Sequence, residues 1–158
     1  MLKLTATIQS ALQAHGADSY PYEGCGLLLG RIEGATNVVV DLFPVENRWP
    51  DEEERRTRFQ IAPEDMLQAE LAAEDRGLDV VGVFHSHPDH PAVASPRDLA
   101  WAAWPGLSYL ITEVHQGQPG RSRSWQLLPD RSGFTEEKIE RIGDVADPDA
   151  TKIGSRLF

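Results

Sequence analysis

The stretch VVGVFHSHPDHPAVASPRD, residues 80–98, joins an apolar run to a dense group of polar side chains. The continuous apolar run is typical of a strand that is buried on both faces. Because strand side chains alternate between the two faces, His85 and His87 project to the same side. Ser95 and Asp98 follow with the S-x-x-D spacing of a helix start, and a proline stands at the first helical position. The stretch therefore predicts a buried strand ending in two aligned imidazoles, then a turn into a short helix.

Helical and strand patterns alternate along the rest of the chain. Residues 4–16 and 62–77 have helical periodicity, and each segment ends at a glycine. Short apolar or β-branched runs between polar, Gly-containing or Pro-containing connections indicate strands. We expect helices over residues 4–16, 62–77, 95–106 and 135–143, and strands over residues 23–32, 36–47, 58–61, 79–87, 107–115 and 121–129.

Length and composition favour one independently folding unit. A chain of 158 residues can bury roughly two-thirds of its unfolded surface without disulfide staples, and its single cysteine, Cys25, can form none internally. The net charge of −10 argues against nucleic acid and anionic membranes as partners. No signal peptide or membrane-spanning run is visible, which predicts a cytoplasmic protein. We expect one α/β domain with a mixed sheet over residues 1–143, and a tail over residues 144–158 without clear periodicity, where partial disorder is expected.

His85 and His87 can grip one metal ion from a rigid strand, but a catalytic zinc site needs a third protein ligand. One candidate set is local, because HSHPDH matches the His-x-His-x-Asp-His pattern of metallo-β-lactamase-like hydrolases and would add Asp89 and His90. The remainder of that pattern is missing, since the only histidine further along the chain is His115, inside an expected strand.

The second candidate ligand is Asp98. Seven residues separate His87 from Ser95, and two separate Ser95 from Asp98. Together with His85, this spacing matches the signature His-x-His-x7-Ser-x2-Asp of the JAMM (MPN+, Mov34/PAD-1) zinc isopeptidases, and the sequence resembles that family closely. The family also places a glutamate just before its first strand, and YPYEGCGLLLG supplies Glu23 there. The segments PVEN, with Asn47, and RFQIAPEDM are also similar to the bacterial members. The resemblance therefore extends over about residues 23–110, most of the domain.

The resemblance implies the chemistry of a zinc peptidase. One zinc ion per chain would be held by His85, His87 and Asp98, with a fourth position left for water. Glu23 would act as general base and then acid, and Ser95 would donate a hydrogen bond to the oxyanion. The implied fold is α/β (α+β), a single MPN-type domain similar to the cytidine-deaminase-like fold, with a mixed β-sheet flanked by helices.

The resemblance also implies a substrate class. Members of the family cleave a peptide or isopeptide bond after the C-terminal Gly-Gly of a ubiquitin-like protein, and the small prokaryotic type is linked to ubiquitin-like sulfur carriers. The C-terminal tail of such a protein is the expected partner. The sequence leaves the identity of this protein, the leaving group and the oligomeric state of the enzyme open.

Two alternatives remain. Helix capping alone would explain the spacing of Ser95 and Asp98, and a non-catalytic MPN scaffold would keep the fold as an interaction module. The metallo-β-lactamase-like hypothesis differs in its ligands, because it needs His90 where the JAMM hypothesis needs Asp98. A cytidine-deaminase type of zinc site is excluded, since it requires a Pro-Cys-x-x-Cys segment that a chain with one cysteine lacks.

Overall fold

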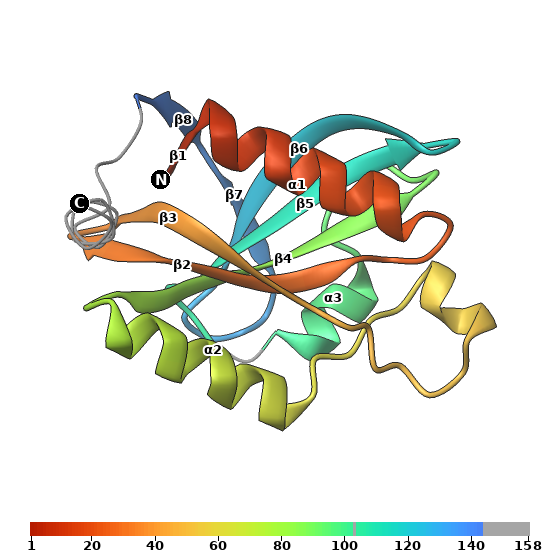
Figure 1. Ribbon diagram of the computed structural model, residues 1–158, viewed down its shortest axis with the longest axis horizontal. Helices are drawn as coiled ribbons and strands as arrows, with labels where there is room; N and C mark the ends of the chain where they lie inside the picture. The colour runs from red at the N-terminus through yellow and green to blue at the C-terminus, as the bar shows by residue number, and fades with distance from the viewer. Residues whose placement is uncertain (103, 144–158) are drawn as a thin grey trace, which may run out of the picture.

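A mixed sheet of eight strands runs through the computed structural model, which describes residues 1–102 and 104–143 (Figure 1). The strands lie in the order β7-β6-β5-β4-β2-β3-β1-β8. Three helices and a 3₁₀ turn accompany them within the described part of the chain, so the predicted mixed α/β class is confirmed. The bounds are β1 Leu2–Thr5, α1 Ala6–Ser19, β2 Cys25–Glu33, β3 Thr36–Val45, η1 Glu53–Arg56, α2 Pro63–Asp75, β4 Asp79–Pro88, α3 Pro96–Trp101, β5 Ser108–His115, β6 Gln118–Leu127, β7 Phe134–Glu137 and β8 Ile139–Ile142.

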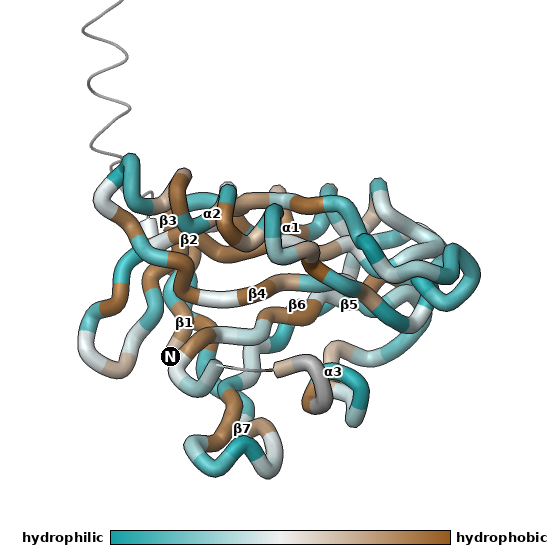
Figure 2. Tube along the Cα trace, turned by 90° about the horizontal axis from the view of Figure 1, so that it is seen from below, coloured by the Kyte–Doolittle hydropathy of each residue, from teal (hydrophilic) through white to brown (hydrophobic). Residues whose placement is uncertain are grey.

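Helices α1 and α2 cover opposite faces of the sheet, and each face has its own apolar core (Figure 1). Leu28 of β2 packs beneath α1, whereas Leu27 and Leu29 pack beneath α2, and all three are almost fully buried. Figure 2 shows the resulting hydrophobic segments along β2, β3 and β4. This double burial explains why the sequence of β2 is a continuous apolar run.

Strand β4 lies in the middle of the sheet, antiparallel to β2 and parallel to β5. Its register pairs His85 with Cys25, the first residue of β2. Glu23 immediately precedes that strand, so the pairing brings it to the same end of the sheet as the histidines. The strand order therefore joins two parts of the sequence that are 62 positions apart.

The first helix differs from the prediction at both ends. Residues 2–5 form β1, which pairs in parallel with β3 and β8. Helix α1 begins at Ala6, and Thr5 is its N-cap, since the Thr5 side chain accepts a hydrogen bond from the Ile8 N–H. The helix also continues past Gly16 to Ser19. A Cβ atom on Gly16 would lie 3.0 Å from Val114 and 3.3 Å from Ser86, so this glycine permits close packing of the helix on the sheet and does not end it.

Two short segments were assigned wrongly from the sequence. Residues 58–61 were expected to form a strand but belong to no helix or strand, and residues 135–143 were expected to be helical. Instead, β7 pairs with β6, and β8 pairs in parallel with β1. The local pattern Thr-Glu-Glu-Lys favours a helix start, but pairing with the preceding strand β6 and with the distant strand β1 outweighs that weak preference.

The division into a domain over residues 1–143 and a tail stays a prediction, because residues 144–158 lie outside the described part of the chain. Among the described residues, no helix has both the length and the apolar character needed to cross a membrane.

Candidate metal centre and active site

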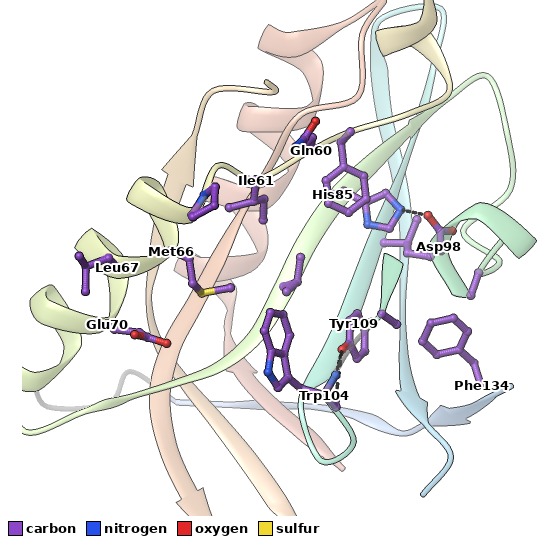
Figure 3. A pocket seen from close by; sticks show the side chains of 16 residues that line it. Gln60, Ile61, Met66, Leu67, Glu70, His85, Asp98, Trp104, Tyr109 and Phe134 are labelled. Carbon is purple, nitrogen blue, oxygen red and sulfur yellow. Dashed lines mark hydrogen bonds and ion pairs between the residues drawn. The ribbon is translucent and has the colours of Figure 1, made fainter. Parts of the chain in front are cut away.

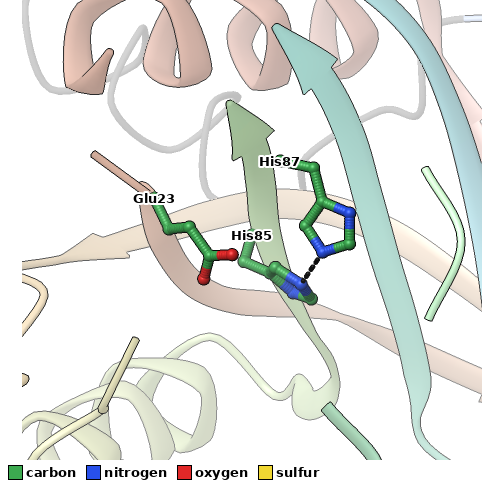
Figure 4. Close-up of side chains that lie close together, drawn as sticks. All are labelled: Glu23, His85 and His87. Carbon is green, nitrogen blue, oxygen red and sulfur yellow. Dashed lines mark hydrogen bonds between the residues drawn. The ribbon is translucent and has the colours of Figure 1, made fainter. Parts of the chain in front are cut away.

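The two imidazoles at the end of β4 face one another, as the alternation of strand side chains predicts. The Nε2 atoms of His85 and His87 are 3.0 Å apart, and both side chains are buried (Figure 4). Burial lowers the pKa of His85, with His87 acting in the same direction and the Asp98 carboxylate opposing both. The neutral imidazole that this favours is the form that binds a metal.

Contacts outside the cluster hold both rings in place. His87 Nδ1 lies 2.7 Å from the carbonyl oxygen of Pro91. An Nδ1–H that donates to this carbonyl leaves the Nε2 lone pair free to point at His85, and such bonds commonly orient metal-binding histidines. On the other side, the Phe59 ring stacks on His85 with centroids 4.5 Å apart. The imidazole pair is therefore preorganised by the protein.

Asp98 completes a triangle with the histidines. Its Oδ1 atom lies 3.2 Å from His85 Nε2, and its Oδ2 atom lies 3.4 Å from His87 Nε2. Burial acts to raise the pKa of Asp98, but the histidines and the Ser95 N–H outweigh it and hold the pKa well below its usual range. The residue is an ionised carboxylate whose side chain is only 11% exposed, so it needs cationic or hydrogen-bonding partners.

The spacing of the three donor groups fits a zinc ion. Ligand atoms about 2.0–2.1 Å from a tetrahedral zinc lie about 3.3 Å from each other. The two Nε2 atoms are 3.0 Å apart, and each lies near a different oxygen of the Asp98 carboxylate, at 3.2 Å from Oδ1 and 3.4 Å from Oδ2, so all three separations are close to that value. Two nitrogens and one carboxylate also match the ligand types of catalytic zinc sites, which keep one position open.

Glu23 approaches the same cluster from the start of β2 (Figure 4). One of its carboxyl oxygens and one nitrogen from each histidine all lie within 4.8 Å of one another. Burial, and then repulsion from the Asp98 carboxylate, raises the pKa of Glu23 to about 9, although Arg97 acts in the opposite direction. Without a metal, this carboxyl group is therefore protonated at neutral pH.

Ser95 combines a capping role with a position in the site. Its hydroxyl oxygen accepts from the Asp98 N–H at 3.1 Å, and Asp98 Oδ2 accepts from the Ser95 N–H at 2.7 Å. This capping box fixes the start of α3 and aims Asp98 at the histidines. Because the hydroxyl accepts in this bond, its own proton stays free to donate. Ser95 also lines a surface pocket together with Glu23 and His87.

The alternative local ligand set is not assembled. Asp89 has φ +57°, in the left-handed region, and its carboxylate accepts hydrogen bonds from the Tyr20 hydroxyl at 2.7 Å and the Gln116 N–H at 2.8 Å. These bonds tie Asp89 to the end of α1 and to the β5–β6 turn. His90 lines a surface pocket that also contains Glu23, His87 and Ser95. The hydrogen bonds of Asp89 therefore direct its carboxylate away from the histidine pair.

A buried backbone position, Ala92, anchors the loop between β4 and α3. Its N–H donates to Glu113 Oε1 at 3.0 Å, and its carbonyl accepts from the Trp125 indole at 3.0 Å. The loop is thus fixed one residue after Pro91, which holds His87. Sequence reasoning missed Glu113, Trp125 and Phe59, because none belongs to a recognisable spacing pattern.

Cys25 takes no part in the cluster. Burial raises the pKa of its thiol to about 12, with Glu23 and Asp65 acting in the same direction. A protonated, buried thiol is chemically inert, so the cysteine is a core residue of β2.

An apolar pocket of about 390 Å³ opens beside the cluster, between α2, α3 and the sheet (Figure 3). His85 and Asp98 form part of its wall, while most of the remaining lining is apolar or aromatic, including Met66, Trp104 and Phe134. A second, smaller pocket on the side of Glu23 contains Arg58 and Arg97. The cluster therefore lies between an apolar and a more polar recess.

Comparison with known protein families shows to which family the chain belongs. Residues 5–128 match the model of prokaryotic homologues of the JAB domain. The chain belongs to this family. A desampylase from Haloferax volcanii is similar to this JAB-domain protein, with 35% identity over 114 residues, 70% of this chain and 78% of the relative. A desampylase from Pyrococcus furiosus is 33% identical over 74% of both chains. A Thermus thermophilus protein named a probable TtuB-protein conjugate cleaving protease is 37% identical over 58% of this chain and 57% of its own length.

Solved structures support the same relationship. A protein from Desulfitobacterium hafniense superimposes with a TM-score of 0.79 and 32% identity, covering 92% of this JAB-domain chain and 95% of the other. A JAB1/MPN domain protein from Archaeoglobus fulgidus superimposes with a TM-score of 0.54 at 18% identity, covering 90% and 97% of the two chains, which shows a shared fold. The family resemblance inferred from the motif is confirmed.

Proposed function

We propose that this protein is a zinc metallopeptidase that cleaves a peptide or isopeptide bond after the C-terminal Gly-Gly of a ubiquitin-like or sulfur-carrier protein. The convergence of His85, His87 and Asp98 at separations of 3.0–3.4 Å, with Glu23 beside them, is the observation that carries this proposal. A cytoplasmic location, which the single cysteine favours, belongs to the same proposal.

In this proposal, His85, His87 and Asp98 hold one zinc ion per chain. Zinc, when bound, supplies a Lewis acid that lowers the pKa of a water molecule, polarises a carbonyl group and favours the ionised form of the neighbouring Glu23. The protein contributes the geometry. The capping box directs Asp98, the Pro91 carbonyl orients His87, and Phe59 keeps water from one side of His85.

Glu23 and Ser95 supply the proton transfer and the hydrogen bond that peptide hydrolysis needs. Glu23 accepts a proton from the attacking water and returns it to the nitrogen of the leaving amine. The Ser95 hydroxyl, whose proton is not used by the capping box, donates to the oxygen that becomes negatively charged. The attacking water adds directly to the carbonyl carbon, so no side-chain nucleophile is needed.

The substrate class rests on the relatives and on the shape of the site. Two relatives are named desampylase, and the name of a third describes cleavage of a protein conjugate. A flexible C-terminal tail can reach a buried centre that a folded protein cannot enter, and two glycines, which have no side chains, need the least room to do so. The apolar pocket next to His85 and Asp98 offers a place for an apolar side chain of the same tail.

The proposal is tested on purified protein loaded with zinc. A small ubiquitin-like protein ending in Gly-Gly, fused to a short peptide or joined to a lysine side chain, is incubated with the enzyme and followed by mass spectrometry. We expect a product that ends at the second glycine, and loss of activity with a chelator. Glu23→Gln should keep zinc and lose activity, whereas His90→Ala should keep most of both.

Two results would contradict the proposal. Full activity of Glu23→Gln would exclude Glu23 as the base. Absence of bound zinc in a folded wild-type protein dialysed against zinc would favour a non-catalytic scaffold.

A further inference from the structure

Asn47, two residues beyond the end of β3, uses the full hydrogen-bonding capacity of its side-chain amide. Its Nδ2 atom donates to the carbonyl oxygens of Glu23 at 3.0 Å and Arg58 at 2.9 Å. Its Oδ1 atom accepts from the N–H groups of Trp49 at 3.0 Å and Gln60 at 3.2 Å. One half-buried side chain therefore joins four backbone groups.

These bonds tie together two walls of the site that no strand pairing connects. One wall is the segment before β2, where the Glu23 N–H also donates to the Arg55 carbonyl at 2.7 Å. Both backbone groups of Glu23 are consequently bound to residues between positions 47 and 55. The carboxyl group of Glu23 can then vary its position relative to β4 only through its own side-chain torsions.

The other wall is the extended segment 58–60. Asn47 binds the carbonyl of Arg58 and the N–H of Gln60, the two residues that flank Phe59. The Phe59 ring lies on His85, with an angle of 26° between the ring planes. Residues 58–61 belong to no strand, and one backbone bond, from the Arg48 N–H to the Gln60 carbonyl at 2.9 Å, joins them to the chain next to Asn47. The two bonds to the Asn47 side chain add the contacts on either side of Phe59 that hold this segment in place.

We infer that Asn47 is the positioning residue of this site: its amide sets the location of the general base Glu23 relative to the two histidines and holds Phe59 against His85. This role rests on the proposed peptidase function. Asn47 does not contact the cluster itself and acts through the backbone of residues 23 and 58–60.

Asn47→Asp is the sharpest perturbation. The substitution keeps the size of the side chain and its acceptor for Trp49 and Gln60, but it replaces the two N–H donors by a carboxylate oxygen. The carbonyls of Glu23 and Arg58 then face negative charge in place of a donor. Asn37→Asp is the control for the same amide-to-carboxylate change. The Asn37 amide also donates to two backbone carbonyls, those of Val81 and Gly106, and to Ser108, but it lies at the opposite end of β3.

Activity is measured with zinc-loaded wild-type protein and both variants on the Gly-Gly fusion. We expect Asn47→Asp to lower kcat roughly 10- to 100-fold, the usual cost of losing a supporting contact, while KM and zinc content stay close to wild type. Asn37→Asp should lower the melting temperature without this selective loss of kcat. Unchanged kcat in Asn47→Asp, or an equal loss in both variants, would overturn the inference.

A second measurement does not depend on activity. Hydrogen exchange of the Glu23 amide, followed by NMR in the metal-free protein, should become at least about tenfold faster in Asn47→Asp and not in Asn37→Asp. Unchanged exchange in Asn47→Asp would overturn the positioning role. The two conclusions can also separate. If exchange is faster in Asn47→Asp but the wild-type protein cleaves no Gly-Gly substrate, the positioning role is supported and the proposed function is contradicted.

Discussion

Replacing Glu23 by glutamine should change how the stability of the metal-free protein depends on pH. Glu23 is only 5% exposed, and burial together with Asp98 raises its pKa from 4.5 to about 9. The folded protein therefore keeps a proton that the unfolded chain releases above about pH 4.5. The free energy of unfolding contains the full contribution of this proton below about pH 4.5. As the pH rises from there towards 9, that contribution falls by up to about 1.4 kcal/mol per pH unit. Glutamine is uncharged throughout and lacks this loss.

Urea unfolding with a chelator present, followed by tryptophan fluorescence, measures the difference between the two proteins. From about pH 6 to about pH 8, Glu23→Gln should gain up to about 2.7 kcal/mol in the free energy of unfolding relative to wild type. Glu46→Gln, whose side chain is 68% exposed, controls for the loss of one negative charge. The reasoning about the buried carboxyl group would be refuted if the difference in the free energy of unfolding stayed constant with pH. It would also be refuted if the wild type became more stable relative to the variant as the pH rises.

Three further outcomes are expected. Asp98→Asn should lose zinc on dialysis while His90→Ala keeps it, as metal analysis can check, and a zinc-replete Asp98→Asn would contradict the ligand assignment. Ala102→Phe should fill the apolar pocket and raise KM for a Gly-Gly substrate, and an unchanged KM would mean that the tail does not use this pocket. Glu113→Ala removes the acceptor of the Ala92 N–H and should weaken zinc binding about 10- to 100-fold in a chelator competition, whereas wild-type affinity would show that the loop anchor is dispensable.

The local parts of the site could be predicted because their geometry is set by near neighbours. Alternation along a strand is enough to place His85 and His87 on one face, and the S-x-x-D capping box is complete within four residues. The structure has both features, with the two Nε2 atoms 3.0 Å apart and Asp98 capping α3. The capping box leaves Asp98 close to both histidines, because Oδ2 accepts from the Ser95 N–H while Oδ1 lies 3.2 Å from His85 Nε2.

Errors arose where distant pairing decides the local structure. Residues 135–143 have a helix-like start, but β7 and β8 gain their hydrogen bonds from β6 and β1. Gly16 resembles a helix stop, yet its missing Cβ lets α1 pack against Val114 and Ser86. In each case the partner lies outside the segment itself, and β1, the partner of β8, is at the other end of the chain, so periodicity within one segment could not identify it.

The sequence by itself determined the chemical inventory: two aligned imidazoles, a capped carboxylate, an upstream glutamate and the family to which they belong. The motif spacing already favoured Asp98 over Asp89 as the acid of the cluster. The tertiary structure decided where the two carboxylates lie: that of Asp89 accepts from Tyr20 and Gln116, whereas that of Asp98 lies 3.2 Å from His85 Nε2. It also decided the environment of Glu23 and the role of Asn47. The burial of Glu23, its repulsion by Asp98 and the four hydrogen bonds of Asn47 all join segments that are apart in the sequence. These segments meet only when β2 pairs with β4 and residues 47–60 fold over that end of the sheet.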